Sequence, residues 1–108
     1  MAQKYYVASK GSYYLSVTNH PGTLTEQDIV SNLARMMMLE ADSEEQNVQA
    51  RTIREEASRF YQENIERIME MVKPGEELKE IPQEEAEEYQ NLTFSEWEQW
   101  EFPQTEWN

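Results

Sequence analysis

The sequence predicts an α+β fold, in which an N-terminal β-hairpin packs on two α-helices, the second one long, and an acidic, aromatic-rich C-terminal segment contains short helices. Three observations predict it: a Lys-Gly pair between two tyrosine-rich stretches, helical spacing of apolar residues from residue 26, and acids and tryptophans gathered after residue 73. With 108 residues the chain has room for one core. We expect residues 1–73 to form that core and residues 74–108 to belong to the same domain or to dock on a partner.

The hairpin is predicted from two stretches rich in β-branched and aromatic residues, KYYVAS at 4–9 and SYYLSV at 12–17. Lys10 and Gly11 would form a two-residue loop between them. Pairing Ser9 with Ser12 would then bring Tyr6 opposite Leu15. Since an isolated two-stranded ribbon is marginal in water, we expect helices or a partner to cover it.

The first helix is predicted over residues 26–41. Thr25 followed by Asp28 is typical of a capping box at its start. Apolar residues recur at helical spacing and extend almost all round the helix, so we expect it to be well buried or covered by another chain. Its three consecutive methionines, Met36 to Met38, are interpreted as core residues, one of which meets the hairpin, the second helix or a second chain.

The second helix is predicted to begin near Ser43 and to end before Pro74. At ~1.5 Å per residue it would be roughly 45 Å long, which exceeds the ~35 Å diameter of a compact domain of this size. We therefore expect a break near its start, an elongated molecule, or a dimer along this element. Charges that alternate every four residues from Arg51 to Arg67 indicate a solvated face.

Two short helices are expected in the last third of the chain. Pro82 suits the first turn of a helix that runs through Tyr89. Thr93 followed by Glu96 predicts another capping box, and we expect Phe94, Trp97 and Trp100 to share one face of the helix that follows. These rings would either fold back over the hairpin or dock into a groove of a partner.

The charge is unevenly distributed along the chain. Nine basic residues oppose 22 acids, for a formal net charge of −13. Residues 1–24 carry a net charge of +2, residues 25–73 carry −5, and residues 74–108 carry −10, with Lys79 as the one base there. An acidic chain is unsuited to direct binding of nucleic acid or of an anionic membrane. The chain also has no apolar signal core and no stretch that could span a bilayer, so we expect a cytoplasmic protein.

Catalysis has little support in the sequence. The chain has no cysteine, which excludes disulfides, thiol catalysis and thiolate metal sites. His20, the single histidine, stands next to Pro21 and is interpreted as a turn residue rather than a general base. No phosphate-binding glycine loop, calcium loop or nucleophile elbow is present. We expect no enzyme activity, no cofactor and no metal.

The acidic rear of the chain is the strongest candidate for a site. Four carboxylates within residues 84–88 would place one charge per ~1.9 Å of helix, close to the ~1.7 Å per phosphate charge along duplex DNA. A surface of this kind can occupy a basic groove that normally holds nucleic acid. The alternative is a solvated acidic tail. The candidate partner-binding residues are Glu76, Glu77, Glu80, Glu84, Glu85, Glu87, Glu88, Trp97 and Trp100.

These features lead to a functional hypothesis. In physical type, though in no motif, the chain resembles the small acidic inhibitors that phages encode, such as DNA-mimic anti-restriction and anti-CRISPR proteins. That resemblance implies a non-enzymatic inhibitor whose partner is a basic nucleic-acid-binding protein. The alternative is a homo-oligomeric helical scaffold or assembly protein, and a homodimer stays open.

Overall fold

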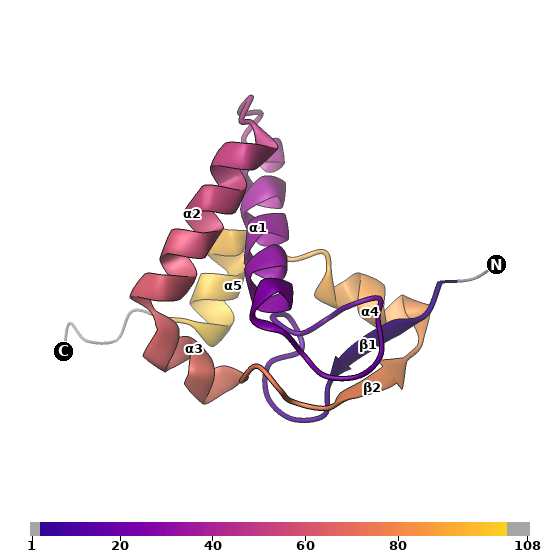
Figure 1. The fold of residues 1–108 in the computed structure, drawn as a ribbon. Coiled ribbons are helices and arrows are strands. Elements are labelled where there is room, and N and C mark those ends of the chain that lie inside the picture. The colour runs from indigo at the N-terminus through magenta and orange to yellow at the C-terminus, as the bar shows by residue number, and fades with distance from the viewer. Residues whose placement is uncertain (1–2, 104–108) are drawn as a thin grey trace.

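The chain forms a two-stranded sheet and five helices within residues 3–103, the part that the structure, a computed structural model, describes. Figure 1 shows α1 and α2 side by side as an upright pair, with α5 near its base on one side and the sheet with α4 on the other. The predicted α+β class is confirmed. The elements in chain order are β1 (Tyr5–Ala8), α1 (Glu26–Ser43), α2 (Ala50–Glu63), α3 (Ile65–Met71), β2 (Leu78–Ile81), α4 (Gln83–Tyr89) and α5 (Phe94–Glu101).

The sheet is antiparallel, as expected, but the partner strand comes from a distant part of the chain. β1 pairs with β2 in the register Tyr5 to Ile81 and Ala8 to Leu78, whereas residues 12–17 were predicted to supply the second strand. On its other edge β1 forms an isolated bridge with Thr18, through two backbone hydrogen bonds with Tyr6 of 2.9 and 2.8 Å. The predicted pairing of Ser9 with Ser12 is therefore wrong.

Gly11 explains why the chain leaves the strand direction. Its φ is +91°, and a Cβ there would lie 2.0 Å from the carbonyl oxygen of Met71. The backbone thus passes directly over the end of α3, where Ser12 N–H donates to that same oxygen at 3.0 Å. Residues 13–16 then turn, and the Ser16 hydroxyl accepts from Ala8 N–H at 3.0 Å in place of a second strand.

The first helix begins as predicted. The Thr25 side chain accepts from Asp28 N–H at 3.1 Å, and the Asp28 carboxylate accepts from Thr25 N–H at 2.8 Å, which completes the capping box. α1 continues to Ser43, two residues beyond the expected end. Within residues 3–103 no helix has the length and apolar character that crossing a bilayer requires.

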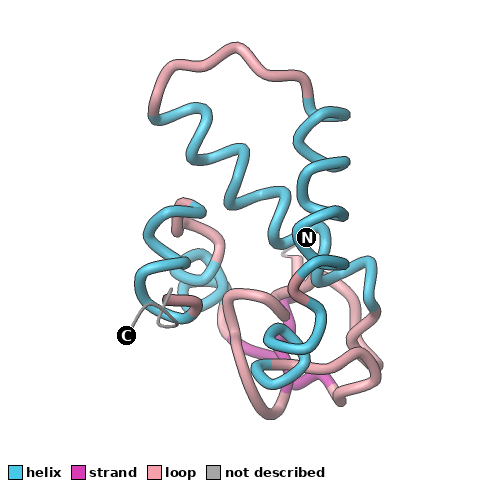
Figure 2. Tube along the Cα trace, turned by 90° about the vertical axis from the view of Figure 1, so that its left-hand side faces the viewer, coloured by secondary structure: helices cyan, strands magenta, loops and turns pink. Residues whose placement is uncertain are grey.

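The predicted long second helix is interrupted. It starts at Ala50 rather than near Ser43, after the loop that Figure 2 shows between the two upright helices, and it ends at Glu63, before the shorter α3. At the break, the side-chain amide and the backbone N–H of Asn64 both donate to the Phe60 carbonyl at 3.0 Å, so this acceptor is shared. The Cα radius of gyration is 13.7 Å, so the expected overshoot is absent.

The main core lies where α1, α2 and α5 meet. It contains fully buried side chains from almost the whole length of the described chain, among them Leu15, Leu33, Tyr61, Trp97 and Phe102. A second, smaller cluster fills the space between the sheet and α4 with Val7, Val17, Ile81 and Ala86. Residues of the acidic last third therefore contribute to both clusters.

Candidate protein-interaction surfaces

The outer face of α4 carries three exposed carboxylates. Glu84, Glu87 and Glu88 are exposed, whereas Ala86 is fully buried. Glu84 and Glu88 lie one turn apart, ~6 Å along the axis, and Glu87 is their neighbour on the same face. The helix thus presents a stripe of three negative charges over a distance of a single turn.

Further glutamates lie on β2 and on the segment that leads into it. Glu77 and Glu80 are exposed and Glu76 is half-buried. Figure 1 shows β2 running directly into α4. We call this region the β2–α4 acidic surface; it comprises Glu76, Glu77, Glu80, Glu84, Glu85, Glu87 and Glu88.

These carboxylates have no cationic partner within the described part of the chain. The ion pairs found there join His20 to Asp28 and Arg51 to Glu55, both away from β2 and α4. The intervening base, Lys79, donates instead to the Tyr13 hydroxyl at 3.2 Å and lies 5.2 Å from the centre of that ring. Within residues 3–103, these glutamates therefore form no ion pair.

Several contacts hold α4 in place. The Arg35 guanidinium donates to the Tyr89 carbonyl at 3.1 Å, at the end of the helix where a cation is favoured. The Tyr89 ring packs edge-on against Tyr14, with 5.3 Å between centroids, and its hydroxyl donates to Glu85 at 2.8 Å. Burial, together with that carboxylate, raises the pKa of Tyr89 to about 12. The acidic stripe consequently sits on a fixed support.

The two candidate tryptophans lie in different environments. Trp97 is fully buried: its ring stacks on Phe102 at 5.2 Å and its Nε1–H donates to Glu101 at 2.9 Å. Trp100 is 66% exposed. Each step of three residues turns the side-chain direction by about 60°, so two steps place Trp100 ~120° from Phe94. The expectation of a single aromatic face is wrong, and of the two tryptophans only Trp100 can touch a partner.

The aromatic residues of α5 do fold back on the domain, but they cover α2 rather than a tyrosine hairpin. Phe60 of α2 packs edge-on against Phe94 at 5.1 Å and against Trp97 at 6.1 Å. α5 is also fixed to α1, because the Glu40 carboxylate accepts from Ser95 N–H at 3.1 Å and from its hydroxyl at 2.9 Å. These bonds hold the pKa of Glu40 below its usual value. Trp107 lies outside the described residues.

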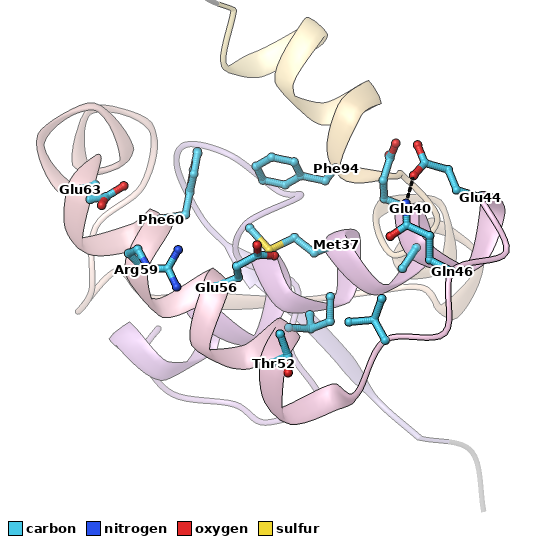
Figure 3. A pocket seen from close by; sticks show the side chains of 13 residues that line it. Met37, Glu40, Glu44, Gln46, Thr52, Glu56, Arg59, Phe60, Glu63 and Phe94 are labelled. Carbon is cyan, nitrogen blue, oxygen red and sulfur yellow. Dashed lines mark hydrogen bonds between the residues drawn. The ribbon is translucent and has the colours of Figure 1, made fainter.

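A second candidate surface is a groove of about 490 Å³ between α1, α2 and the start of α5, which Figure 3 shows from close by. We call it the α1–α2 groove. Its floor is apolar and is formed by Met37, Ala41, Val48, Ile53, Phe60 and Phe94. Its rim carries charge from Glu40, Glu44, Glu56, Arg59 and Glu63.

His20 fastens a loop, as its interpretation as a turn residue implies. One ring nitrogen, Nε2, lies 2.9 Å from the Asp28 carboxylate, and Nδ1 lies 2.9 Å from the Pro21 carbonyl. Both neighbours are acceptors, so the protonated ring satisfies both, and the hydrogen bonds to Pro21 and Asp28 raise the pKa of His20. Within residues 3–103, no group of three acidic or histidine side chains could hold a metal ion.

Sequence reasoning singled out the glutamates of the β2–α4 acidic surface, which stays a prediction as a binding site, and missed the α1–α2 groove. The signal that could have revealed it was the apolar character all round residues 26–41, since Met37 lies outside the buried stripe and faces the groove. Comparisons of this chain with protein-family models, with curated proteins and with solved structures find no match.

Proposed function

We propose that this protein is a non-enzymatic inhibitor that uses its β2–α4 acidic surface to bind a basic, nucleic-acid-binding surface of another protein. The observation that supports the proposal best is a set of seven glutamates, on β2, on α4 and on the residues that lead into β2, that have no cationic partner within residues 3–103. Charges left unpaired in a folded domain are available to a partner of the opposite sign, and they speed its encounter.

The support beneath these charges favours specific binding over simple solubility. α4 is anchored by fully buried Ala86 and by the contact of Arg35 with the Tyr89 carbonyl. A surface that is ordered before binding loses little conformational entropy when a partner docks on it. The three stripe carboxylates of α4 fall within ~7.5 Å of helix, or ~2.5 Å per charge, compared with ~1.7 Å per phosphate charge of duplex DNA.

Inhibition would follow from competition. A basic groove occupied by Glu84, Glu87 and Glu88 cannot hold phosphates at the same time, so the partner loses access to its nucleic acid without any covalent step. A phage-type role against restriction or CRISPR nucleases is the biological setting that this chemistry suits. The homo-oligomeric alternative loses its main argument, because α2 ends at Glu63 and does not overshoot the domain.

The proposal is tested by capture on the immobilised protein from a bacterial lysate, followed by elution with duplex DNA. We expect at least one retained protein to elute with DNA and to be lost when Glu84, Glu85, Glu87 and Glu88 are changed to glutamine. Glutamine keeps the size and helix propensity of each side chain and removes its charge.

A matched control removes four charges elsewhere, through Asp42→Asn with Glu55→Gln, Glu66→Gln and Glu70→Gln, all at exposed positions. This control variant should retain the same protein. Retention that is equal for the parent and the α4 variant, and that DNA does not reverse, would show that the β2–α4 acidic surface has no such role.

A further inference from the structure

The floor of the α1–α2 groove is apolar surface that the domain leaves partly uncovered. Met37, Phe60 and Phe94 are half-buried, and Val48 in the loop between the helices is half-buried as well. Figure 3 shows Met37, Phe60 and Phe94, which come from α1, α2 and α5, around one hollow. The groove volume of about 490 Å³ lies in the range that is usual for ligand-binding pockets of proteins. Methionine and phenylalanine adapt well to apolar side chains of a partner.

The rim gives the groove a definite charge. Glu44, Glu56 and Glu63 are exposed, and Glu40 is held in place by its two hydrogen bonds to Ser95. Four carboxylates against Arg59 leave a formal rim charge of −3. None of the five side chains forms an ion pair within residues 3–103.

The apolar floor and the acidic rim together favour one class of ligand over others. A nucleic acid is repelled by the rim, and a second copy of this chain would bring a net charge of −13 toward the same carboxylates. An uncharged apolar ligand would leave the rim unused. A helix with apolar residues on one face and lysines or arginines along its flanks satisfies both parts, because its apolar face enters the hollow while its cations reach the glutamates.

We infer that the α1–α2 groove binds a basic amphipathic helical segment of a partner protein. This inference goes beyond the proposed function, because it uses different residues and needs apolar anchors as well as charge. Loss of the β2–α4 acidic surface should leave groove binding nearly unchanged.

The experiment uses a fluorescently labelled peptide of leucine and lysine, about 18 residues or five helical turns long, titrated with the full chain at near-physiological salt. We expect saturable binding and a shift of the Met37 methyl signal in a methionine-labelled sample, with no comparable shift of Met69 on α3. A second peptide carries serine at the leucine positions and should bind at least about tenfold more weakly, since it lacks apolar anchors.

Matched charge reversals locate the site. Glu56→Lys with Glu63→Lys alters the rim, whereas Glu66→Lys with Glu70→Lys makes the same change in net charge on α3, outside the groove. All four positions are exposed, so both variants should fold. We expect the rim variant to lose about tenfold or more in affinity and the α3 variant to lose about twofold or less.

Three results would overturn the inference: no binding of the leucine–lysine peptide, equal binding of the serine peptide, or equal losses in the two charge-reversed variants. Either of the last two results would mean that the peptide binds through general electrostatic attraction to an acidic protein and not through the groove. Sedimentation that shows self-association of the parent, abolished in the rim variant, would assign the groove to a second copy instead. The Glu-to-Gln variant of α4 tests the proposed function separately, so either idea can fail without the other.

Discussion

α4 and α5 come from the same acidic third of the chain and have nearly the same length, yet they do opposite things. α4 places only Ala86 fully inside and turns Glu84, Glu87 and Glu88 to the surface. α5 buries Trp97 fully and reaches the core again at Phe102, just past its end. α4 therefore presents charge at the surface and is anchored by one small apolar side chain, whereas α5 covers the main core.

The difference shows that the acidic third is not a tail attached to a finished domain. The helix that carries Trp97 packs into the main core. The helix whose glutamates form no ion pair within residues 3–103 leaves its outer face exposed to a partner. Stability and binding should therefore respond to different residues in these two neighbouring helices.

The largest effect is expected at Trp97. Its change to alanine should lower the free energy of unfolding by about 3–5 kcal/mol, because it removes a fully buried indole that packs on Phe60 and Phe102. The matched change of exposed Trp100 to alanine should stay within about 0.5 kcal/mol. Urea unfolding followed by circular dichroism measures both; similar losses at the two positions would mean that the burial assigned to α5 is wrong.

Helix capping should give a middle-sized effect on α5 and almost none on α4. Thr93→Ala removes the side-chain acceptor that Glu96 N–H uses at 3.3 Å, so we expect a loss of about 1 kcal/mol. The N-cap of α4 is Pro82, which provides no side-chain hydrogen bond, and Gln83→Ala should cost only a few tenths of a kcal/mol. Thermal unfolding of the two variants is the check, and a larger loss from Gln83→Ala would contradict it.

Removing charge from α4 should barely change stability. In the Glu-to-Gln variant of residues 84, 85, 87 and 88, relief of repulsion between Glu84 and Glu88 opposes the loss of favourable charges at the start of the helix. We expect the free energy of unfolding to move by less than about 1 kcal/mol in either direction, as measured in urea. A loss of several kcal/mol would make these glutamates structural residues rather than a free surface.

The smallest effect on stability is expected at His20, whose ring is paired with the Asp28 carboxylate. The pKa of His20 is raised in the folded protein, so its contact with Asp28 stabilises the fold below the unfolded pKa of ~6.5 and fades as the pH rises through the folded pKa. His20→Gln should therefore lower stability more at about pH 5.5 than at about pH 8.5. Urea unfolding at both pH values tests this, and the opposite order would exclude a stabilising protonated ring.

Local signals in the sequence predicted part of the fold. The capping boxes at Thr25 and Thr93 were readable because each involves residues only three positions apart, and Pro82 marked the start of α4. The strand that pairs with β1 could not be predicted in the same way. β2 lies about seventy residues further along the chain, and Gly11 turns the backbone onto α3. No periodicity announces a pairing of that separation.

The candidate site was predictable to a similar degree. Glu84, Glu87 and Glu88 in the short helix between Pro82 and Tyr89 are exposed, because only the small side chain of Ala86 is fully buried in this helix. The outward position of Trp100 follows from helical spacing, which turns residue 100 ~120° away from residue 94, and the sequence reasoning overlooked it. The break at Asn64 coincides with a local bond from its side-chain amide to the Phe60 carbonyl, and an asparagine within a helical pattern does not by itself predict a break. The apolar character all round α1 indicated an uncovered face, but the α1–α2 groove itself is formed by three separate elements, and no single stretch of the sequence indicates where they meet.

The central claim is that the unpaired carboxylates of the β2–α4 acidic surface bind a basic partner. Its most direct test is the slope of log affinity against log salt for the captured partner, measured for the parent, the α4 Glu-to-Gln variant and the control variant changed at Asp42, Glu55, Glu66 and Glu70. We predict that the α4 variant binds at least about tenfold more weakly at low salt and has a shallower slope, while the control stays close to the parent. Parallel lines of equal affinity for all three proteins would contradict the account.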